Sequence, residues 1–277
     1  MESHVQYALP FQSKLQDTLR NRQMFKNRHY RFSLTKLLAL SLISFGQSAL
    51  AVDLKVSPFA LYEVGNKDIV IDQVSTKYGL GVLGFNVDAN FQSKLSISGK
   101  LGYGANPSQK ISFSGANFKG TVKGTYVEGA MQYALWTKSD YSVVSELRFI
   151  NRNIDAPDLT GSRNGTALTG NAFTSLDSVD LTIGARMPLG NAAFLNISGG
   201  LSRWHLKSNA TAFYTSGSVS ATARKKIDAV GRDPIVKVSI GSNNPKHNFK
   251  LELANRSLKS KTSAQIMALQ LDYVFKF

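Results

Sequence analysis

Hydrophobic and polar residues alternate with a period of two along most of the chain beyond residue 51. In residues 267–277, every second residue from Met267 to Phe277 is apolar, whereas Gln270, Asp272 and Lys276 lie between them. This alternation is typical of a β-strand with one apolar face and one mixed polar face. Two further strands, at residues 53–63 and 77–87, contain a proline and several glycines that indicate bulges. The clear pattern recurs at residues 95–103, 127–135, 141–149, 180–187, 195–202, 235–240 and 249–254.

The connections between these ten predicted strands fall into two classes that alternate. Short turns are predicted at residues 88–90, 137–140, 188–192 and 242–248. Long polar loops are predicted at residues 65–76, 105–120, 151–175, 206–232 and 255–263. Alternating short and long connections, with both ends of the chain on the short side, are typical of an outer-membrane barrel. We therefore predict an all-β fold, a transmembrane antiparallel up-and-down β-barrel of about ten strands over residues 52–277, with eight or twelve strands as alternatives.

Charged residues occupy the polar faces of these strands, and aromatic residues lie near the ends of the apolar faces. A soluble β-sandwich could not bury charges in mid-strand without partners. A membrane barrel has lipid outside and paired side chains inside, and the aromatic positions suit its two interfacial girdles. We expect a mostly closed lumen that holds a paired network of Glu128, Glu146, Arg148, Asp180, Arg186, Lys237, Glu252 and Asp272. The alternative is a narrow, porin-like channel for small solutes.

Residues 36–51 have the parts of a secretory signal peptide. Lys36 precedes an apolar run at residues 37–45, and small residues in an A-x-A pattern end at Ala51. The apolar run is about half of the roughly 20 residues that a membrane-spanning helix needs. We expect cleavage after Ala51 and a mature chain of residues 52–277. Because residues 24–36 form a basic region of ordinary length, we also expect translation to start at Met24, with residues 1–23 left untranslated.

The last five residues resemble the C-terminal assembly signal of Gram-negative outer-membrane β-barrel proteins. Those proteins end in phenylalanine with aromatic or apolar residues at alternate positions before it, as Tyr273, Phe275 and Phe277 do here. Asp272 stands where that signal often has glycine. With the signal peptide and the alternating connections, the resemblance covers residues 52–277 and matches no particular family. It implies a location in the outer membrane and an interaction of the last strand with the barrel-assembly machinery.

Composition and charge narrow the range of partners. The 277-residue chain has a formal net charge of +15, a mean hydropathy of −0.14 and no cysteine. The lack of cysteine excludes disulfides, thiolate metal sites and a cysteine nucleophile. Residues 1–51 hold seven of the 33 basic and two of the 18 acidic residues, so the mature chain keeps a net charge of +10. An exported chain meets no chromosome, so we expect no binding to nucleic acid. We also expect the protein to be a monomer.

Three of the five long loops carry an excess of positive charge. Such loops could bind the phosphates of lipopolysaccharide or an acidic surface polymer, as some small barrel adhesins do. The alternative is that these charges are merely solvated and suit an anionic outer leaflet. The candidate residues are Lys110, Lys119, Lys123, Arg224, Lys225, Lys226, Arg256, Lys259 and Lys261.

Two histidines of the mature chain bear on enzymatic chemistry. Omptin proteases are ten-stranded barrels that pair an aspartate with a histidine opposite two further aspartates, and neither His205 nor His247 has that setting in the sequence. A lipid-modifying site built on His205 and Ser208 is a third interpretation, after the channel. We place Trp204 and His205 at the outer interfacial rim, and we expect no enzymatic activity, no metal and no cofactor.

Overall fold

The computed structural model describes residues 52–277 except positions 68, 72–73, 77–78, 92–93, 114, 164, 217–218, 243–246, 263 and 276–277. The predicted signal peptide, its cleavage after Ala51 and the start at Met24 lie outside the described residues, as does Phe277. In the described part of the chain, no helix is long and apolar enough to cross a membrane.

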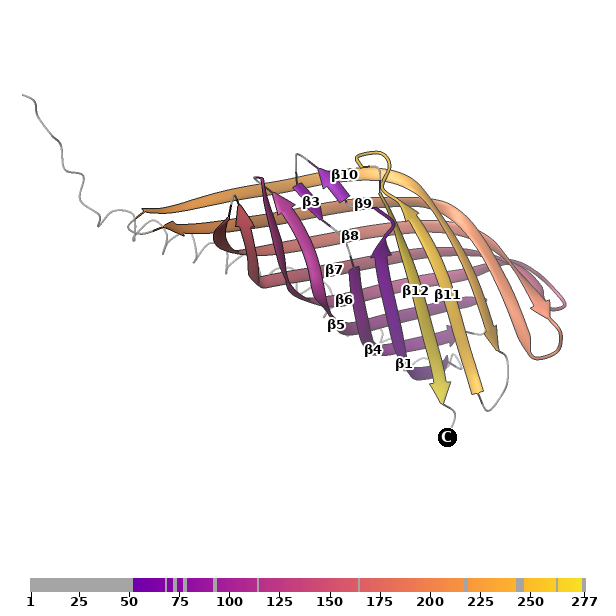
Figure 1. Ribbon diagram of the computed structural model, residues 1–277. Coiled ribbons are helices and arrows are strands. Elements are labelled where there is room, and N and C mark those ends of the chain that lie inside the picture. The colour runs from indigo at the N-terminus through magenta and orange to yellow at the C-terminus, as the bar shows by residue number, and fades with distance from the viewer. Residues whose placement is uncertain are drawn as a thin grey trace, which may run out of the picture. The chain divides into compact units, whose positions relative to one another are not determined.

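Ten long antiparallel strands close into a ring (Figure 1). Each strand pairs with the next along the chain, and β1 pairs with β12, which closes the ring. Two short strands, β2 (Ile69–Ile71) and β3 (Val74–Thr76), lie in the connection that follows the first long strand. They pair with each other, and β3 also pairs with the end of β5. The predicted ten-stranded up-and-down barrel is confirmed, and its strands are β1 (Val52–Gly65), β4 (Gly79–Phe91), β5 (Leu95–Phe113), β6 (Ala116–Lys138), β7 (Tyr141–Arg163), β8 (Thr166–Leu189), β9 (Ala193–Ser216), β10 (Val219–Ser242), β11 (His247–Ser257) and β12 (Gln265–Phe275).

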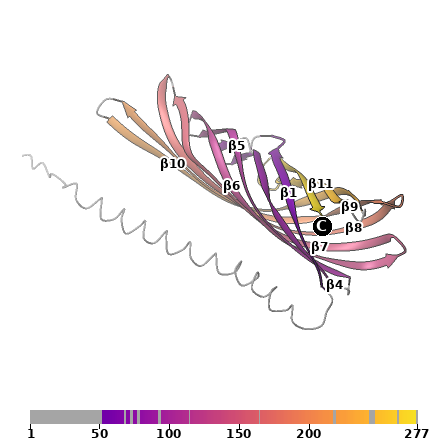
Figure 2. The same ribbon diagram turned by 90° about the horizontal axis from the view of Figure 1, so that it is seen from below.

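Three of the predicted long loops are strands instead. The β9–β10 ladder continues to the pair Ser216 and Val219, the β5–β6 ladder to Phe113 and Ala116, and the β7–β8 ladder to Arg163 and Thr166. These hairpins extend beyond the shorter strands β11 and β12 (Figures 1 and 2). Lipid demands apolar outward side chains only inside the membrane. Above the membrane the hydrophobic alternation fades while the hydrogen-bonded ladder continues. The sequence pattern therefore placed the ends of these strands too early.

The first strands also differ from the sequence-based prediction. The predicted turn at residues 88–90 is part of β4, and β1 and β4 pair in continuous register without the predicted bulges. Irregular register occurs instead in the β5–β6, β6–β7 and β7–β8 ladders. The glycines of this region serve a packing purpose: Gly84 and Gly102 lie in one row between Phe59 and Tyr126. A Cβ atom on Gly84 would come within 2.7 Å of the Phe59 ring, so the absence of side chains lets the two aromatic rings approach to 5.9 Å between centroids.

An apolar belt surrounds the outside of the ring. Its exposed side chains include Leu83, Phe85, Leu101, Leu181 and Leu201, which all lie on the outward faces of their strands. Because every strand in the ring has a neighbour on both sides, the backbone groups behind this belt are hydrogen-bonded to one another, as a hydrocarbon environment requires. The aromatic residues near the ends of the apolar faces that suit the interfacial girdles include Tyr103, Tyr133, Tyr141 and Phe149, and all four are exposed on the same face.

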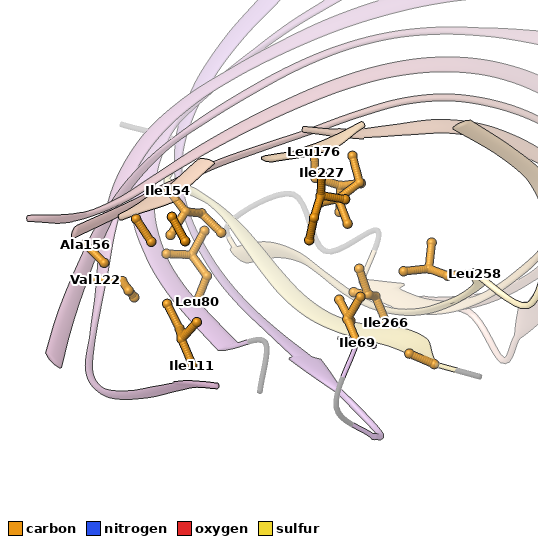
Figure 3. Close-up of a cluster of buried hydrophobic side chains, with 14 of the residues drawn as sticks. Ile69, Leu80, Ile111, Val122, Ile154, Ala156, Leu176, Ile227, Leu258 and Ile266 are labelled. Carbon is orange, nitrogen blue, oxygen red and sulfur yellow. The ribbon is translucent and has the colours of Figure 1, made fainter. Parts of the chain in front are cut away.

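A second group of apolar side chains points into the interior near the end of the barrel that carries the long hairpins (Figure 3). It includes Leu80 on β4, Leu176 on β8 and Ile227 on β10, together with Leu258 in the β11–β12 turn and Ile266 on β12. Leu80, Leu176 and Leu258 have no exposed surface. Longer connections face the outside of the cell in such barrels, so this apolar group lies in the extracellular half of the barrel.

Candidate functional site

Charged side chains in the middle of the lumen form a network across the barrel. Arg148 on β7 donates to Glu252 on β11 (Nη1–Oε1, 2.6 Å) and to Glu146 (Nε–Oε1, 2.8 Å). On the same level, Lys237 pairs with Glu146. All of these side chains are at least nine-tenths buried. Ion pairs between distant strands therefore tie opposite parts of the wall together, and the interior is occupied by side chains.

The network continues to the seam of the barrel. Lys100 on β5 lies 3.1 Å from Asp272 on β12 and 3.6 Å from Glu128 on β6. Glu128 also accepts a hydrogen bond from the Tyr126 hydroxyl. Each buried charge of the network lies within 3.8 Å of an opposite charge, which is the arrangement that buried charges require. Seven of the eight residues that the sequence assigned to the lumen are buried in this network or in the layer of ion pairs above it. They are Glu128, Glu146, Arg148, Asp180, Lys237, Glu252 and Asp272.

A further layer of ion pairs lies above the network, toward the apolar group. Arg152 on β7 donates two hydrogen bonds of 2.6 Å to Glu63 on β1. Arg256 on β11 pairs with Asp180 on β8, which also accepts a hydrogen bond from Ser202. The sequence placed Arg256 on a basic outer loop, and that prediction is wrong. The alternation of β11 continues to Ser257 and turns the Arg256 side chain inward, where it is 2% exposed.

The turn between β11 and β12 folds into the mouth of the barrel. Asp233 on β10 holds it: one carboxylate oxygen accepts from the Ser260 backbone N–H (2.9 Å) and the other from the Ser260 hydroxyl (2.7 Å). The second oxygen also accepts from the Trp204 indole N–H (2.8 Å). Trp204 has no exposed surface, so its predicted place at the outer interfacial rim is wrong. The turn, Trp204 and the apolar group together cover the network from the outside.

Arg186 lies apart from the network, toward the opposite end of the barrel. Its guanidinium stacks on the Phe194 ring at 3.7 Å from the centroid. Both residues line a polar pocket of about 570 Å³ together with residues of the β6–β7 and β8–β9 turns, among them Asp140 and Asn191. These turns are the short connections, so the pocket lies at the periplasmic end of the barrel.

The basic residues predicted for the outer loops do not form a single patch. Lys110 and Lys119 lie directly opposite each other across β5 and β6, and Lys123 lies opposite Asp155 across β6 and β7. Lys259 and Lys261 are exposed in the β11–β12 turn. On the third hairpin, Arg224 and Lys226 are exposed on the outward face of β10, whereas Lys225 between them is half-buried on the other face.

The outward face of β9 and β10 carries further cations that are not among the candidate residues named from the sequence. Above the belt residue Leu201, this face presents Arg203 and Lys207 on β9, with Arg232 on β10. Arg203 and Lys207 continue the alternation of residues 195–202, so extending that pattern by a few residues places both of them on the outward face. In antiparallel register Arg203 lies opposite Arg232, and Lys207 lies opposite Asp228.

His205 lies on the same outward face and contacts Asp228, with 2.6 Å between Nε2 and Oδ1. This hydrogen bond, together with nearby lysines, holds the pKa of the Asp228 carboxyl below its usual range. Asp177 on β8 lies opposite His205 in register. Ser208, the partner considered from the sequence, instead hydrogen-bonds Thr174 with 3.0 Å between hydroxyl oxygens. Sequence spacing could not reveal these carboxylates, because both come from neighbouring strands.

The terminal assembly signal is described in part. Tyr273 lies opposite Phe249, and Phe275 lies opposite His247 at the end of the β11–β12 ladder. Tyr273 is half-buried and shares the outward face of β12 with the belt residues Leu269 and Leu271.

Comparison with solved structures gives membrane barrels at low sequence identity. The translocator domain of the autotransporter NalP from Neisseria meningitidis is 12% identical, with a TM-score of 0.48 and coverage of 91% of this chain and 98% of that one. The outer-membrane protease OmpT from Escherichia coli is 8% identical, with a TM-score of 0.47 and coverage of 84% and 99%. The attachment invasion locus protein Ail of Yersinia pestis, in complex with the heparin analogue sucrose octasulfate, is 10% identical, with a TM-score of 0.34 and coverage of 81% and 99%. No protein-family model and no curated protein matches the sequence.

The class of the protein follows from its own architecture. A ring of ten antiparallel strands, an outward apolar belt with aromatic residues at its margins, and a polar, ion-paired interior are the defining features of an outer-membrane β-barrel. The chain is an outer-membrane β-barrel protein.

Proposed function

We propose that this protein is a non-enzymatic barrel with a closed lumen, and that its outer wall binds acidic saccharides through the β9–β10 hairpin. The shared chemistry of the ligand is a saccharide that carries phosphate or sulfate groups. Lipopolysaccharide of the surrounding leaflet and an acidic polymer outside the cell are two sources of that chemistry.

The observation that carries the proposal is the pair of cations near the end of the hairpin. Arg224 and Lys226 are exposed on the outward face of β10. Their opposite neighbours on β9 are Thr211 and Asn209, so no carboxylate lies directly across from either cation. Guanidinium and ammonium groups attract anionic groups, while hydroxyl and amide side chains can hydrogen-bond to sugar hydroxyls. This surface therefore offers both kinds of contact that an acidic saccharide needs.

The position of the hairpin supports access by a large ligand. β10 pairs with β11 only from Ile235 to Gly241. Along the rest of its length toward the tip, from Val219 to Pro234, the paired neighbour among the described strands is β9. The hairpin thus stands at the side of the extended wall, where a polymer can approach its outward face.

The filled lumen favours this function over the channel. Solute would have to pass the apolar group, the turn held by Asp233 and two layers of ion pairs. Barrels of about eight strands have interiors that side chains fill, and here side chains from β1, β5, β6, β7, β8, β10, β11 and β12 meet inside. The lipid-modifying alternative retains the His205–Asp228 contact as its support, but the Ser208 hydroxyl that it invoked is bonded to Thr174.

A binding assay with a sulfated heparin fragment tests the proposal. We expect the purified protein in neutral vesicles to bind the fragment with an affinity that falls as salt rises, because the contacts are ionic. Arg224→Ser with Lys226→Ser should abolish most of the binding, whereas Lys138→Ser, an exposed cation at a periplasmic turn, should leave it unchanged. Binding that survives in the double variant would refute the assignment, as would equal loss in Lys138→Ser.

A second arm distinguishes the two sources of ligand. Phosphorylated lipopolysaccharide core oligosaccharide, freed of its lipid, replaces the heparin fragment in the same assay. If only the core oligosaccharide binds through Arg224 and Lys226, the ligand is the surrounding leaflet; if only the sulfated fragment binds, it is an external polymer. If neither binds, the proposal fails. The pair Lys110→Ser with Lys119→Ser tests the hairpin itself, because loss of binding in that variant alone would move the site to β5 and β6.

A further inference from the structure

Two arginines face each other on the outside of the barrel. Arg203 on β9 and Arg232 on β10 are partners in the antiparallel register, and both are exposed on the outward face. Side chains directly opposite each other in such a pair have their Cβ atoms about 4.5–5.5 Å apart. Like charges at this spacing repel and destabilise the sheet. The repulsion between these two guanidinium groups must therefore be offset by another interaction.

No carboxylate in the described part of the chain forms an ion pair with either arginine. The outward carboxylates nearest in register are Asp177 and Asp228, which lie two and four positions further toward the hairpin tip. Asp177 is bonded by Asn151, and Asp228 is bonded by His205. The neighbour of Arg203 on β8 is the apolar Val179. The positive charge of this pair is therefore left for a ligand.

The level of the two arginines on the barrel is that of the membrane boundary. The next outward residues toward the periplasm are Leu201 and Pro234, and further apolar residues follow on both strands, with Val236 52% and Ile197 45% exposed. The next residues toward the outside are His205 and Val230, after which charged residues begin. Arg203 and Arg232 thus lie at the upper edge of the apolar belt, where lipid chains end and headgroups begin.

We propose that Arg203 and Arg232 form a binding site for the phosphate group of an outer-leaflet lipid headgroup. Two oxygens of a phosphate group can accept two parallel N–H hydrogen bonds from one guanidinium group, which makes arginine a favoured residue for binding phosphate. One dianion between the two side chains replaces their repulsion with two attractions, and the acyl chains of the same molecule lie along Leu201 and Pro234. A third cation, Lys259, lies in the exposed turn that Asp233, the residue after Arg232, holds in place.

This site is independent of the proposed saccharide binding. Arg203 and Arg232 lie at the belt, whereas Arg224 and Lys226 lie near the hairpin tip, eight and six residues along β10 from Arg232. The ligand chemistry at the belt is a phosphate ester. A lipid phosphate and a free phosphate share that chemistry, and the adjoining apolar belt favours the lipid.

Thermal unfolding in vesicles tests the site. The purified protein is placed in neutral vesicles that contain lipid A with both phosphates, or lipid A whose phosphates have been removed, and the midpoint of heat-modifiable gel migration is measured. We expect phosphorylated lipid A to raise the midpoint and the dephosphorylated lipid to have no such effect. Arg203→Gln and Arg232→Gln should each lose most of the gain, since one cation near an anionic lipid surface changes binding about fivefold. Lys123→Gln, an outward cation that already faces Asp155, should keep it.

Neutral vesicles alone provide the second readout. Without phosphate, Arg203→Gln and Arg232→Gln should unfold at the wild-type midpoint or above it, because each removes a repulsion; a merely structural arginine would give a lower midpoint. An undiminished gain with lipid A in both variants would overturn the site. A gain from inorganic phosphate equal to that from lipid A would overturn its assignment to lipid. Loss of heparin binding in the Arg224 and Lys226 variant with the lipid A gain intact separates this proposal from the previous one.

Discussion

Charges inside the barrel and charges outside it follow opposite rules. Inside, Arg152 meets Glu63 with two hydrogen bonds of 2.6 Å, and Arg148 is shared among carboxylates from neighbouring and opposite strands. Outside, Arg203 faces Arg232, and Lys110 faces Lys119. Water and ligands can stabilise an unpaired charge on the outer wall, whereas a buried charge must find its partner within the chain. The inner charges are therefore part of the fold, and outer cations with no carboxylate opposite, such as Arg203 and Arg232, are available for binding.

Removal of one inner partner should give the largest effect. Arg152→Met leaves the Glu63 carboxylate buried without its main counter-charge, and such a change costs about 3–5 kcal/mol of folding free energy. Urea unfolding in lipid vesicles measures it. Adding Glu63→Met to Arg152→Met should recover a large part of the loss. The outer variant Arg203→Met serves as control, with an expected change within about 0.5 kcal/mol. Equal losses for Arg152→Met and Arg203→Met would remove the distinction between the two regions.

Displacement of the turn at the mouth should give an intermediate effect. A Cβ atom on Gly231 would come within 2.3 Å of both the Trp204 ring and the Ser260 hydroxyl, and forced overpacking of this kind costs about 1–3 kcal/mol. We expect Gly231→Ala to expose Trp204, seen as a red shift of its fluorescence, and to make the 258–262 turn sensitive to protease. Gly129→Ala, where a Cβ meets nothing within 4 Å, should show neither change. A buried Trp204 in Gly231→Ala would show that the turn does not depend on this packing.

Neutralising single lysines on the β5–β6 hairpin should give the smallest change in folding free energy. The sign of that change should differ between Lys119→Gln and Lys123→Gln. Lys119→Gln removes a like-charge contact with Lys110 and should stabilise the protein by up to about 1 kcal/mol. Lys123→Gln removes an attraction to Asp155 and should destabilise it by a similar amount. Both are measured by urea unfolding at low salt, and both effects should shrink at high salt. Changes of the same sign in the two variants would contradict the register on which the outer face is described.

The sequence predicted the barrel well because the membrane imposes a strict rule on each strand. Alternation between residues 127 and 135 placed Glu128 inward, and the same rule placed Arg148 and Glu252 inward. The rule loses its hydrophobic signal where the lipid ends, which is why residues 151–175 and 206–232 read as loops although they are strands. Arg152, Trp204 and Arg256 were misplaced or missed for this reason, although each keeps the parity of an inward residue on its own strand.

Pairing partners lay beyond what one sequence can provide. Arg256 and Asp180 are 76 residues apart, and Glu63 and Arg152 are 89 residues apart. Their contacts depend on how far each strand is shifted against its neighbour around the ring, a quantity that no local pattern contains. The same holds for Arg203 and Arg232, whose opposition depends on the register of the β9–β10 hairpin.

Conductance in a planar lipid bilayer tests the contrast between a filled interior and an exposed outer wall most directly. The wild-type protein should insert without producing stable current steps, because the network around Arg148, the Arg152–Glu63 layer and the apolar group occupy the lumen. Stable steps whose size shifts when Arg148 is replaced by glutamine would show that ions pass through the network, and the closed lumen would then be wrong.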